Sequence, residues 1–163
     1  MVAFVHLLLN AQSQIKYSGK VETGYHLYLS TPIHYEIGPG WKGHHLSERP
    51  NGAEINVVNG ISYNSVFRAG LGIGYVNYEG INGYSVFGDL EYATQGKVAP
   101  LFNFKVGKSH INNQYDDGHD DTLVEISLGA EWKMSKNTRL QLKGGFRYVH
   151  ETFSLPIRIG VRF

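Results

Sequence analysis

Cysteine is absent from the 163 residues of this chain. The absence excludes a disulfide framework and any thiolate metal site. The sequence also lacks an excess of charge of one sign, because 15 Lys and Arg stand against 14 Asp and Glu and the formal net charge is +1. Without a basic surplus, the composition gives no indication of nucleic-acid binding.

Long apolar runs and helical periodicity are also missing. No apolar run approaches the ~20 residues that a transmembrane helix needs. Charged residues make up 18% of the chain, which is below the usual share of about a quarter. The length suits a single domain. Because no segment shows a convincing helical period, the chain is expected to be all-β.

Alternation of apolar and polar residues is what the sequence does contain. In the closing stretch LPIRIGVRF every second residue is apolar, which is the pattern of a β-strand with two unlike faces. The same alternation predicts eight strands, at residues 15–30, 53–63, 67–75, 84–92, 98–107, 124–133, 139–148 and 155–163.

The predicted strands are long. Most strands of globular proteins have about 5–6 residues, whereas a tilted transmembrane β-strand needs about 9–11. Ten residues at roughly 3.4 Å each, tilted by about 45°, cover about 24 Å, close to the apolar band of an outer-membrane barrel. The connections alternate between short and longer ones, which is the layout of such a barrel.

Glycine indicates which face of the strands points inward. Glycine weakens a strand and has no use on a solvated face, but the crowded interior of a narrow eight-stranded barrel needs small side chains. Nine strand glycines fall on the polar face: Gly24, Gly60, Gly70, Gly72, Gly74, Gly107, Gly129, Gly145 and Gly160. The polar face is therefore predicted to line the lumen, and the apolar face to meet lipid.

Aromatic residues on the apolar face support this orientation. Many of them lie near the ends of the predicted strands, where interfacial aromatic girdles are found in membrane barrels. The predicted girdle consists of Tyr17, Tyr25, Tyr63, Tyr75, Tyr84, Tyr92, Trp132 and Tyr148.

The pattern resembles a known family. The terminal Phe163, the apolar residues at every second place before it, and the tract VVNGISYNSVFRAGLGIGY are similar to the small OmpA/OmpX-like outer-membrane barrels of Gram-negative bacteria. The resemblance covers residues 15–163. It implies an eight-stranded antiparallel up-and-down transmembrane β-barrel in the outer membrane, with both termini on the periplasmic side. It also implies an assembly signal read by the barrel-assembly machinery, formed by Phe153, Leu155, Ile157, Ile159, Val161 and Phe163.

The first 14 residues do not continue the strand pattern. MVAFVHLLLNAQSQ has an apolar core followed by Ala11 and Gln12, which is typical of the end of a secretory signal peptide, although a basic leading region is missing. A short buried strand or helix is the alternative. We expect residues 1–14 to be a signal-peptide remnant or a disordered N-terminus, and residues 15–163 to form the barrel.

Charged residues on the inward face should form a network, because charges in so narrow a space need partners. The predicted network contains Lys20, Glu22, Arg68, Asp89, Glu91, Lys105, Glu125, Glu131, Lys143, Arg147 and Arg158. Lys16, Lys133 and Arg162 are expected on the same face. A filled and paired lumen predicts the absence of an open pore.

Motifs for cofactors or metals are weak. GLGIGY (70–75) lacks the G-x-G-x-x-G spacing of a nucleotide loop. DDGHDD (116–121) could offer oxygen ligands to calcium, but its spacing is not that of an EF-hand. The adjacent His44 and His45 point apart in an extended chain. We therefore predict no cofactor and no metal site.

Hydrolysis of lipid by a hydroxyl nucleophile is a possible activity for a small outer-membrane barrel. It needs a serine or threonine beside a histidine base. The pairs that the sequence offers are His150 with Thr152 or Ser154, and His26 with Ser30. None of them stands in a recognisable motif, so no catalytic residue is predicted.

The function expected from these patterns is that of a non-enzymatic outer-membrane protein that acts through loops at residues 31–52 and 108–122. The expected partners are outer-membrane lipid, lipopolysaccharide and an unknown extracellular ligand, in adhesion, surface binding or envelope integrity. Two alternatives remain open at this point: an enzyme that modifies outer-membrane lipid, and a soluble lipocalin-like carrier whose apolar face would be buried.

Overall fold

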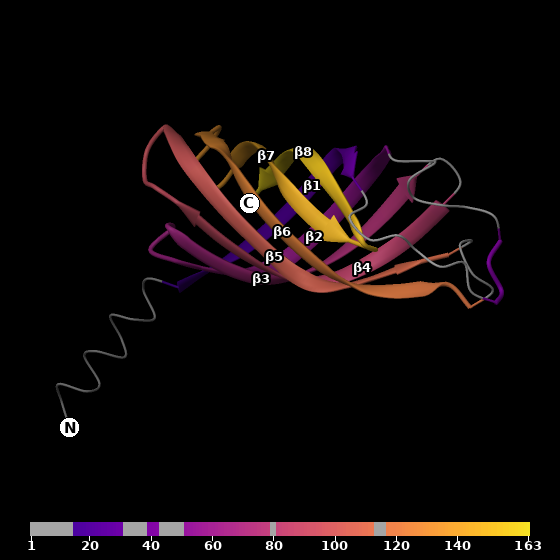
Figure 1. Cartoon of the computed structure of the whole chain (residues 1–163). Helices are drawn as coiled ribbons and strands as arrows, with labels where there is room; N and C mark the ends of the chain where they lie inside the picture. Colours follow the sequence, from indigo (N-terminus) through magenta and orange to yellow (C-terminus); the bar gives the residue numbers. More distant parts are fainter. Residues whose placement is uncertain (1–14, 31–38, 43–50, 79–80, 113–116) are drawn as a thin grey trace, which may run out of the picture.

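The structure, a computed structural model, describes residues 15–30, 39–42, 51–78, 81–112 and 117–163. They form a closed antiparallel barrel in which each strand pairs with its neighbours in chain order and the last strand closes on the first (Figure 1). The strands are β1 (Ile15–Ser30), β2 (Gly52–Tyr63), β3 (Phe67–Tyr78), β4 (Ile81–Ala93), β5 (Val98–Ile111), β6 (His119–Lys133), β7 (Arg139–Val149) and β8 (Thr152–Arg162). The predicted eight-stranded up-and-down barrel is thus confirmed.

The two ends of the barrel differ. One end, called the terminal end here, carries Ile15, Phe163 and the tight turns after β2, β4 and β6. The opposite end, called the loop end, carries the connections after β1, β3, β5 and β7. No helix in the described part of the chain is long and apolar enough to cross a membrane. The predicted leader at 1–14, and most of the predicted loop at 31–52, lie outside the described residues.

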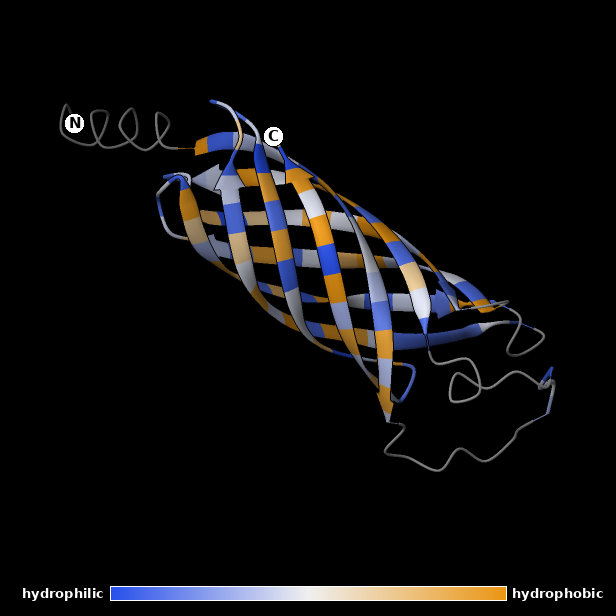
Figure 2. Ribbon diagram, turned by 90° about the horizontal axis from the view of Figure 1, so that it is seen from above, coloured by the Kyte–Doolittle hydropathy of each residue, from blue (hydrophilic) through white to orange (hydrophobic). Residues whose placement is uncertain are grey.

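The outer wall of the barrel is apolar and its lumen is charged. Leu71 and Leu128 expose 73% and 66% of their surface on the outside, whereas Glu22 and Glu131 expose 1% and 0% inside. The ribbon coloured by hydropathy alternates along each strand accordingly (Figure 2). A soluble barrel has the opposite arrangement, so the lipocalin-like alternative is wrong and the barrel is of the membrane-spanning kind.

Aromatic side chains of the outer wall lie in two groups. Tyr17, Tyr63, Tyr92 and Trp132 lie toward the terminal end, and Tyr25, Tyr75, Tyr84 and Tyr148 toward the loop end. Phe67 belongs to the first group as well, because its ring packs against Tyr92 at a centroid distance of 5.0 Å. The eight-residue step from Phe67 to Tyr75 along a tilted strand spans about 20 Å, so the two groups frame an apolar band of membrane dimensions.

The strands continue past the apolar band at the loop end, and there the pattern inverts. Val76, Tyr78, Ile81 and Ile111 point inward and form a buried cluster, while Asn77 and Lys108 are exposed on the outside. This apolar-in, polar-out arrangement is that of a sheet standing in water.

The inversion corrects one expectation. Most of the predicted long loop at 108–122 is strand, because Lys108 pairs with Thr122 and Ile111 pairs with His119. Its polar sequence reflects an aqueous outer face, and its buried inward side chains Ser109 and Ile111 identify it as part of the barrel.

Small residues make room in the lumen. A Cβ at Gly72 would collide with the ring of Phe87, the large aromatic side chain that projects inward from β4 and is 2% exposed. The Nζ of Lys105 lies over the same ring, 4.9 Å from its centroid. Gly72 on β3 therefore allows β4 to fill the middle of the lumen with an aromatic ring.

Candidate functional site

The lumen is the largest organised site of the described chain. Six carboxylates lie inside it, and each is within ion-pair or hydrogen-bond distance of a cation. They face six lysines and arginines that are equally buried, and Arg162, which is 9% exposed, adds a seventh cation at the terminal end. The carboxylates are Glu22, Glu54, Asp89, Glu91, Glu125 and Glu131, and the cations are Lys20, Arg68, Lys105, Lys143, Arg147 and Arg158.

Glu22 of β1 is the centre of the middle layer. Its carboxylate pairs with Lys105 and, at 2.8 Å, with the Nζ of Lys143. The Nζ of Lys20 lies 3.5 Å away, and the Nε of Arg158 lies 3.6 Å away. Strands β1, β5, β7 and β8 thus meet on one carboxylate, which fastens opposite walls of the barrel to each other.

A second layer lies nearer the loop end and is built around Glu54. Arg147 and His26 both bond to its carboxylate, and the Nη2 of Arg158 donates to it at 3.1 Å. Arg158 also donates to Glu125. Because Arg158 contacts Glu22 as well as Glu54, it connects the second layer to the middle one.

The third layer lies toward the terminal end. Arg68 donates to Glu91 and makes two hydrogen bonds to Glu131, at 2.9 and 2.8 Å. Gln141 bridges the same two carboxylates, at 2.8 Å to Glu91 and 3.2 Å to Glu131. Lys20 links this layer to the middle one, since it donates to Glu91 at 3.2 Å and to Asp89 at 2.7 Å.

The network predicted from the sequence contains most of these residues but not Glu54, His26 and Gln141. Glu54 and His26 both lie in the lumen, and their positions on the polar face of the alternation could have found them. Conversely, Lys16 and Lys133 were expected to face the lumen and are exposed at the terminal rim. Their inward-facing register position lies at a strand end, where a long side chain reaches water instead of the interior.

Little space remains inside. The inner hollow beside Lys20, Arg68 and Asp89 measures about 10 Å³, which is room for about one water molecule. Beyond the charged layers, the apolar cluster of Val76, Tyr78, Ile81 and Ile111 lies across the loop end of the lumen. The charged layers and this cluster lie one above the other inside the described barrel.

Polar side chains gather around the loop end. The Nδ1 of His110 lies 2.7 Å from a carboxylate oxygen of Asp120. The backbone N–H of Glu151 donates to Asp121 at 3.3 Å. No three His, Asp or Glu side chains of the described residues are grouped in a way that would hold a metal ion. Part of the two motifs considered for metal binding lies outside the described residues, namely His44, His45 and Asp116.

None of the histidine–hydroxyl pairs weighed for catalysis is formed. His26 bonds to Glu54, and Thr152 donates its hydroxyl to the backbone oxygen of His150. Instead, the Nε2 of His150 lies 3.1 Å from the Oγ of Ser109. Both of these side chains are buried, and the Nδ1 of His150 has no hydrogen-bond partner in the described part of the chain.

Burial dominates the protonation of His150, which sits in the turn between β7 and β8. Together with the neighbouring His119 and Arg147, burial lowers the pKa of this imidazole from 6.5 to about 3. His150 is therefore neutral at physiological pH and serves as a hydrogen-bonding group in the wall of the loop end.

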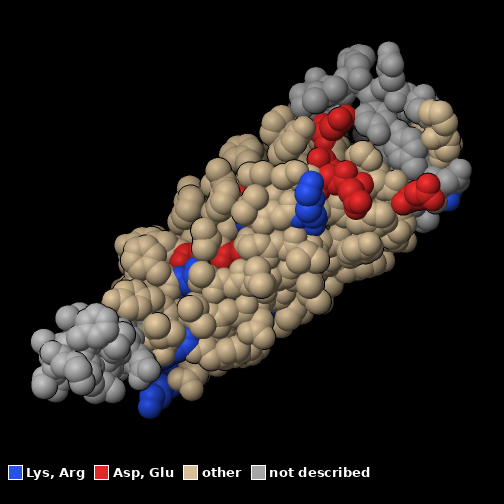
Figure 3. Space-filling model, turned by 90° about the horizontal axis from the view of Figure 1, so that it is seen from below, with Lys and Arg blue, Asp and Glu red and all other residues tan. Residues whose placement is uncertain are grey.

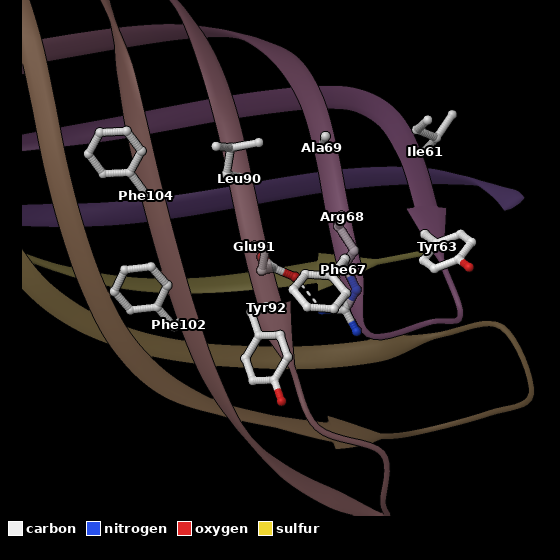
Figure 4. Close-up of a pocket in the computed structure, with 10 residues that line it drawn as sticks. All are labelled: Ile61, Tyr63, Phe67, Arg68, Ala69, Leu90, Glu91, Tyr92, Phe102 and Phe104. Atoms are coloured by element: carbon white, nitrogen blue, oxygen red, sulfur yellow. Dashed lines mark hydrogen bonds and ion pairs between the residues drawn. The ribbon is translucent and has the colours of Figure 1, made fainter.

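A hollow lies on the outer wall near the terminal end. It measures about 440 Å³ and is lined mainly by apolar side chains of β2 to β5, with the small Ala69 at its floor (Figure 4). The aromatic side chains Tyr63, Phe67, Tyr92, Phe102 and Phe104 stand around it, and the bonded pair Arg68 and Glu91 lies beneath. An apolar hollow on this wall faces lipid.

Comparison with solved structures agrees with this architecture. The crystal structure of Neisserial surface protein A matches with a TM-score of 0.64 at 12% identity, over 91% of this chain and 97% of that chain. The N-terminal β-barrel domain of Pseudomonas aeruginosa OprF matches with a TM-score of 0.57 at 13% identity, over 92% of this chain and 100% of that domain. Neither protein-family profiles nor curated protein sequences give a match.

The fold and the apolar wall together define the class. A closed barrel with an even number of antiparallel strands, a lipid-facing exterior and a polar interior is a transmembrane barrel of the outer-membrane type. The chain has the fold of the small eight-stranded outer-membrane barrels, and the resemblance predicted from its terminal strand is confirmed at the level of the fold.

Proposed function

We propose that this chain is a non-enzymatic surface protein of the outer membrane, which acts through its loop end in adhesion, surface binding or envelope integrity. The observation that supports this proposal most strongly is the filled lumen. Three connected layers of ion pairs and an apolar cluster occupy the interior, so a transported solute has no place in it. Activity is then left to the surface that projects beyond the membrane.

The loop end offers such a surface. Asp117 and Asp120 are exposed there, beside the part-exposed Asp121 and Glu151. The apolar cluster beneath gives these side chains a rigid support, which favours recognition over disorder. Neisserial surface protein A carries a surface location in its name, which agrees with this proposal. Lipopolysaccharide and an extracellular ligand are the proposed partners, and the barrel-assembly machinery would insert the chain.

The test compares two sets of charge variants in a Gram-negative strain that lacks its own copy of the protein. Asp117→Asn with Asp120→Asn changes the loop end, while Lys97→Gln with Lys133→Gln changes the opposite rim. We expect only the loop-end pair to alter cell adhesion or the permeability of the envelope to a large antibiotic. Equal behaviour of both pairs and of the wild type in every such assay would contradict a role of the loop end.

A lipid-modifying enzyme is the second candidate, favoured by the contact of Ser109 with His150. The contact supplies a nucleophile and a base, but the base lacks an orienting third group in the described residues. Mass spectrometry of lipid A from cells with wild type, with Ser109→Ala and without the protein decides the question. The surface-protein proposal predicts three identical spectra, and a mass change that requires Ser109 would establish the enzyme.

A further inference from the structure

A second hollow lies at the terminal end, beside the third layer of the lumen network. It measures about 320 Å³ and its lining includes Lys16, Tyr17, Lys136, Arg139, Arg162 and Phe163, together with Ser62 and Ser65. Arg162 belongs to the lumen face, but Tyr17 and Phe163 are exposed on the lipid-facing wall, at 62% and 53%. The hollow therefore lies at the rim, where the charged interior meets the membrane surface.

Cations outnumber carboxylates around this hollow. Glu131 is shared by three guanidinium groups: Arg68 at 2.8 Å, Arg139 at 2.7 Å and Arg162 at 3.8 Å. The Nε of Arg162 is buried without a hydrogen-bond partner in the described structure. Lys16 and Lys136 are exposed and form no ion pair with a described carboxylate. Apart from the α-carboxylate of Phe163, the lining contains no acidic group.

The exposed carboxylates of the described chain are confined to one end of the barrel. The exposed and part-exposed carboxylates, Asp117, Asp120, Asp121 and Glu151, all lie at the loop end. The terminal rim carries exposed lysines instead. The space-filling view shows acidic side chains gathered toward one end, with a basic side chain beside them, and a basic side chain at the opposite tip (Figure 3). An anion that approaches the terminal end meets these lysines, and no acidic side chain of the described residues is exposed at that end to compete for them.

We propose that this hollow binds the headgroup of an anionic phospholipid from the membrane leaflet at the terminal end. The phosphate would lie among Lys16, Lys136 and Arg139, because guanidinium and ammonium groups form strong charge-assisted bonds with phosphate oxygens. The glycerol and the first acyl carbons would lie beside Tyr17 and Phe163, where aromatic rings favour the membrane interface.

The lining selects a lipid over a free phosphate ion. Inorganic phosphate would use the cations alone and would leave the two lipid-facing rings without a role. A headgroup still attached to its acyl chains reaches both parts of the hollow at once. The inference rests on the terminal end alone and is independent of the function proposed for the loop end.

The experiment titrates the full chain, refolded in zwitterionic detergent micelles, with dihexanoyl phosphatidylglycerol and follows binding by calorimetry. The variant Lys16→Gln with Lys136→Gln removes two exposed cations of the hollow. The matched control, Lys97→Gln with Lys133→Gln, removes two exposed cations of the same end that lie outside it. The two variants have the same net charge as each other, because each loses two lysines. Both are checked for a heat-dependent shift on SDS gels.

The hollow variant should bind the anionic lipid about fivefold more weakly than wild type, since two exposed ion pairs of modest strength are lost. The control variant should bind like wild type, and dihexanoyl phosphatidylcholine should bind far more weakly to all three proteins. An equal loss in both variants would overturn the site, because the rim would then act through its overall charge. Inorganic phosphate that binds as tightly as the lipid would overturn the assignment to a headgroup.

Discussion

Gly19 and Phe163 exchange two backbone hydrogen bonds at the seam of the barrel. The N–H of Gly19 donates to the oxygen of Phe163 at 2.8 Å, and the N–H of Phe163 donates to the oxygen of Gly19 at 2.9 Å. The ring of Phe163 covers the position where a Cβ on residue 19 would stand, with ring carbons 2.5 and 2.9 Å from it. The aromatic ring thus shields the glycine, as in other glycine–aromatic pairs of sheets.

Variants of these two residues can distinguish a role of Phe163 in the proposed assembly signal from a role in packing against Gly19. Phe163→Ala should strongly reduce insertion in cells, because the proposed signal loses its terminal aromatic residue. In detergent the same change removes one partly exposed ring and should cost less than the roughly 1.5–3 kcal/mol of a fully buried one. Gly19→Val displaces the ring but keeps the terminal phenylalanine, so it should lower stability and leave insertion near the wild-type level. Insertion is read from outer-membrane fractions, and stability from urea unfolding.

A different pattern would assign Phe163 a structural role only. If Phe163→Ala and Gly19→Val reduced insertion in proportion to their loss of stability, the terminal residue would act through packing at the seam.

The ion pairs of the lumen make a prediction for stability. Glu91→Ala would leave Arg68 and Lys20 short of a partner, and Glu125→Ala would remove a partner of Arg158. Breaking a buried pair costs about 3–5 kcal/mol, so each variant should unfold at a lower urea concentration. Asp117→Ala, at the exposed loop end, should stay within roughly 0.5 kcal/mol of wild type. Equal urea midpoints for the three variants would indicate a hydrated lumen with weak pairs.

Conductance tests the closed interior directly. In planar bilayers the wild-type barrel should show little or no steady ion current, since the charged layers and the apolar cluster of Val76, Tyr78, Ile81 and Ile111 fill the lumen. Glu22→Ala removes the carboxylate on which Lys105 and Lys143 converge, and it is expected to raise the frequency of brief openings. A large, steady wild-type current would identify a water-filled channel and contradict the proposed function.

The lowered pKa of His150 leads us to expect that the stability of the loop end depends on pH. Its pKa is about 3 in the folded protein against 6.5 for the free side chain, so between these values the unfolded turn binds more protons than the folded one. The stability of the β7–β8 turn should be full above pH 6.5 and decline as the pH falls toward 3. Between pH 7 and pH 5 the loss amounts to about 2 kcal/mol.

Hydrogen exchange of the backbone amides around His150 measures this response. The control is His150→Asn, which does not titrate and tolerates the positive φ of 50° at this position. The variant should show no acid-dependent opening beyond the intrinsic exchange chemistry. An identical pH response in wild type and variant would show that another group opens the turn.

The sequence by itself determined the strand number and the inside-out arrangement of the barrel. A strand has a period of two, so alternation along Ile15–Ser30 or Thr152–Arg162 assigns each side chain to one face without knowledge of its neighbours. Glycines on the polar face then indicated which face is crowded, because only a narrow interior excludes side chains in this way.

Only the tertiary structure decided which lumen side chains pair with one another, because the period of a strand assigns a face and no partner. Alternation places Glu22 in the lumen, but only the register and the curvature of the closed sheet bring Lys105 and Lys143 from other strands to its carboxylate. The same holds for Glu54, whose partners Arg147 and Arg158 are 93 and 104 residues away in the sequence. Ion pairs across a lumen depend on stagger and tilt, which are properties of the whole barrel.

The extent of the membrane band was likewise a tertiary result. Residues 108–122 have a polar sequence and were predicted as a loop, yet residues 108–111 pair with residues 119–122, and the inward side chain of Ile111 is buried. Beyond the lipid the solvent outside the barrel changes from hydrocarbon to water, so the alternation changes sign while the strand continues. One strand therefore faces hydrocarbon along part of its length and water along the rest. The closed barrel shows which residues lie beyond the membrane, and only then can both parts of the pattern be assigned to the same strand.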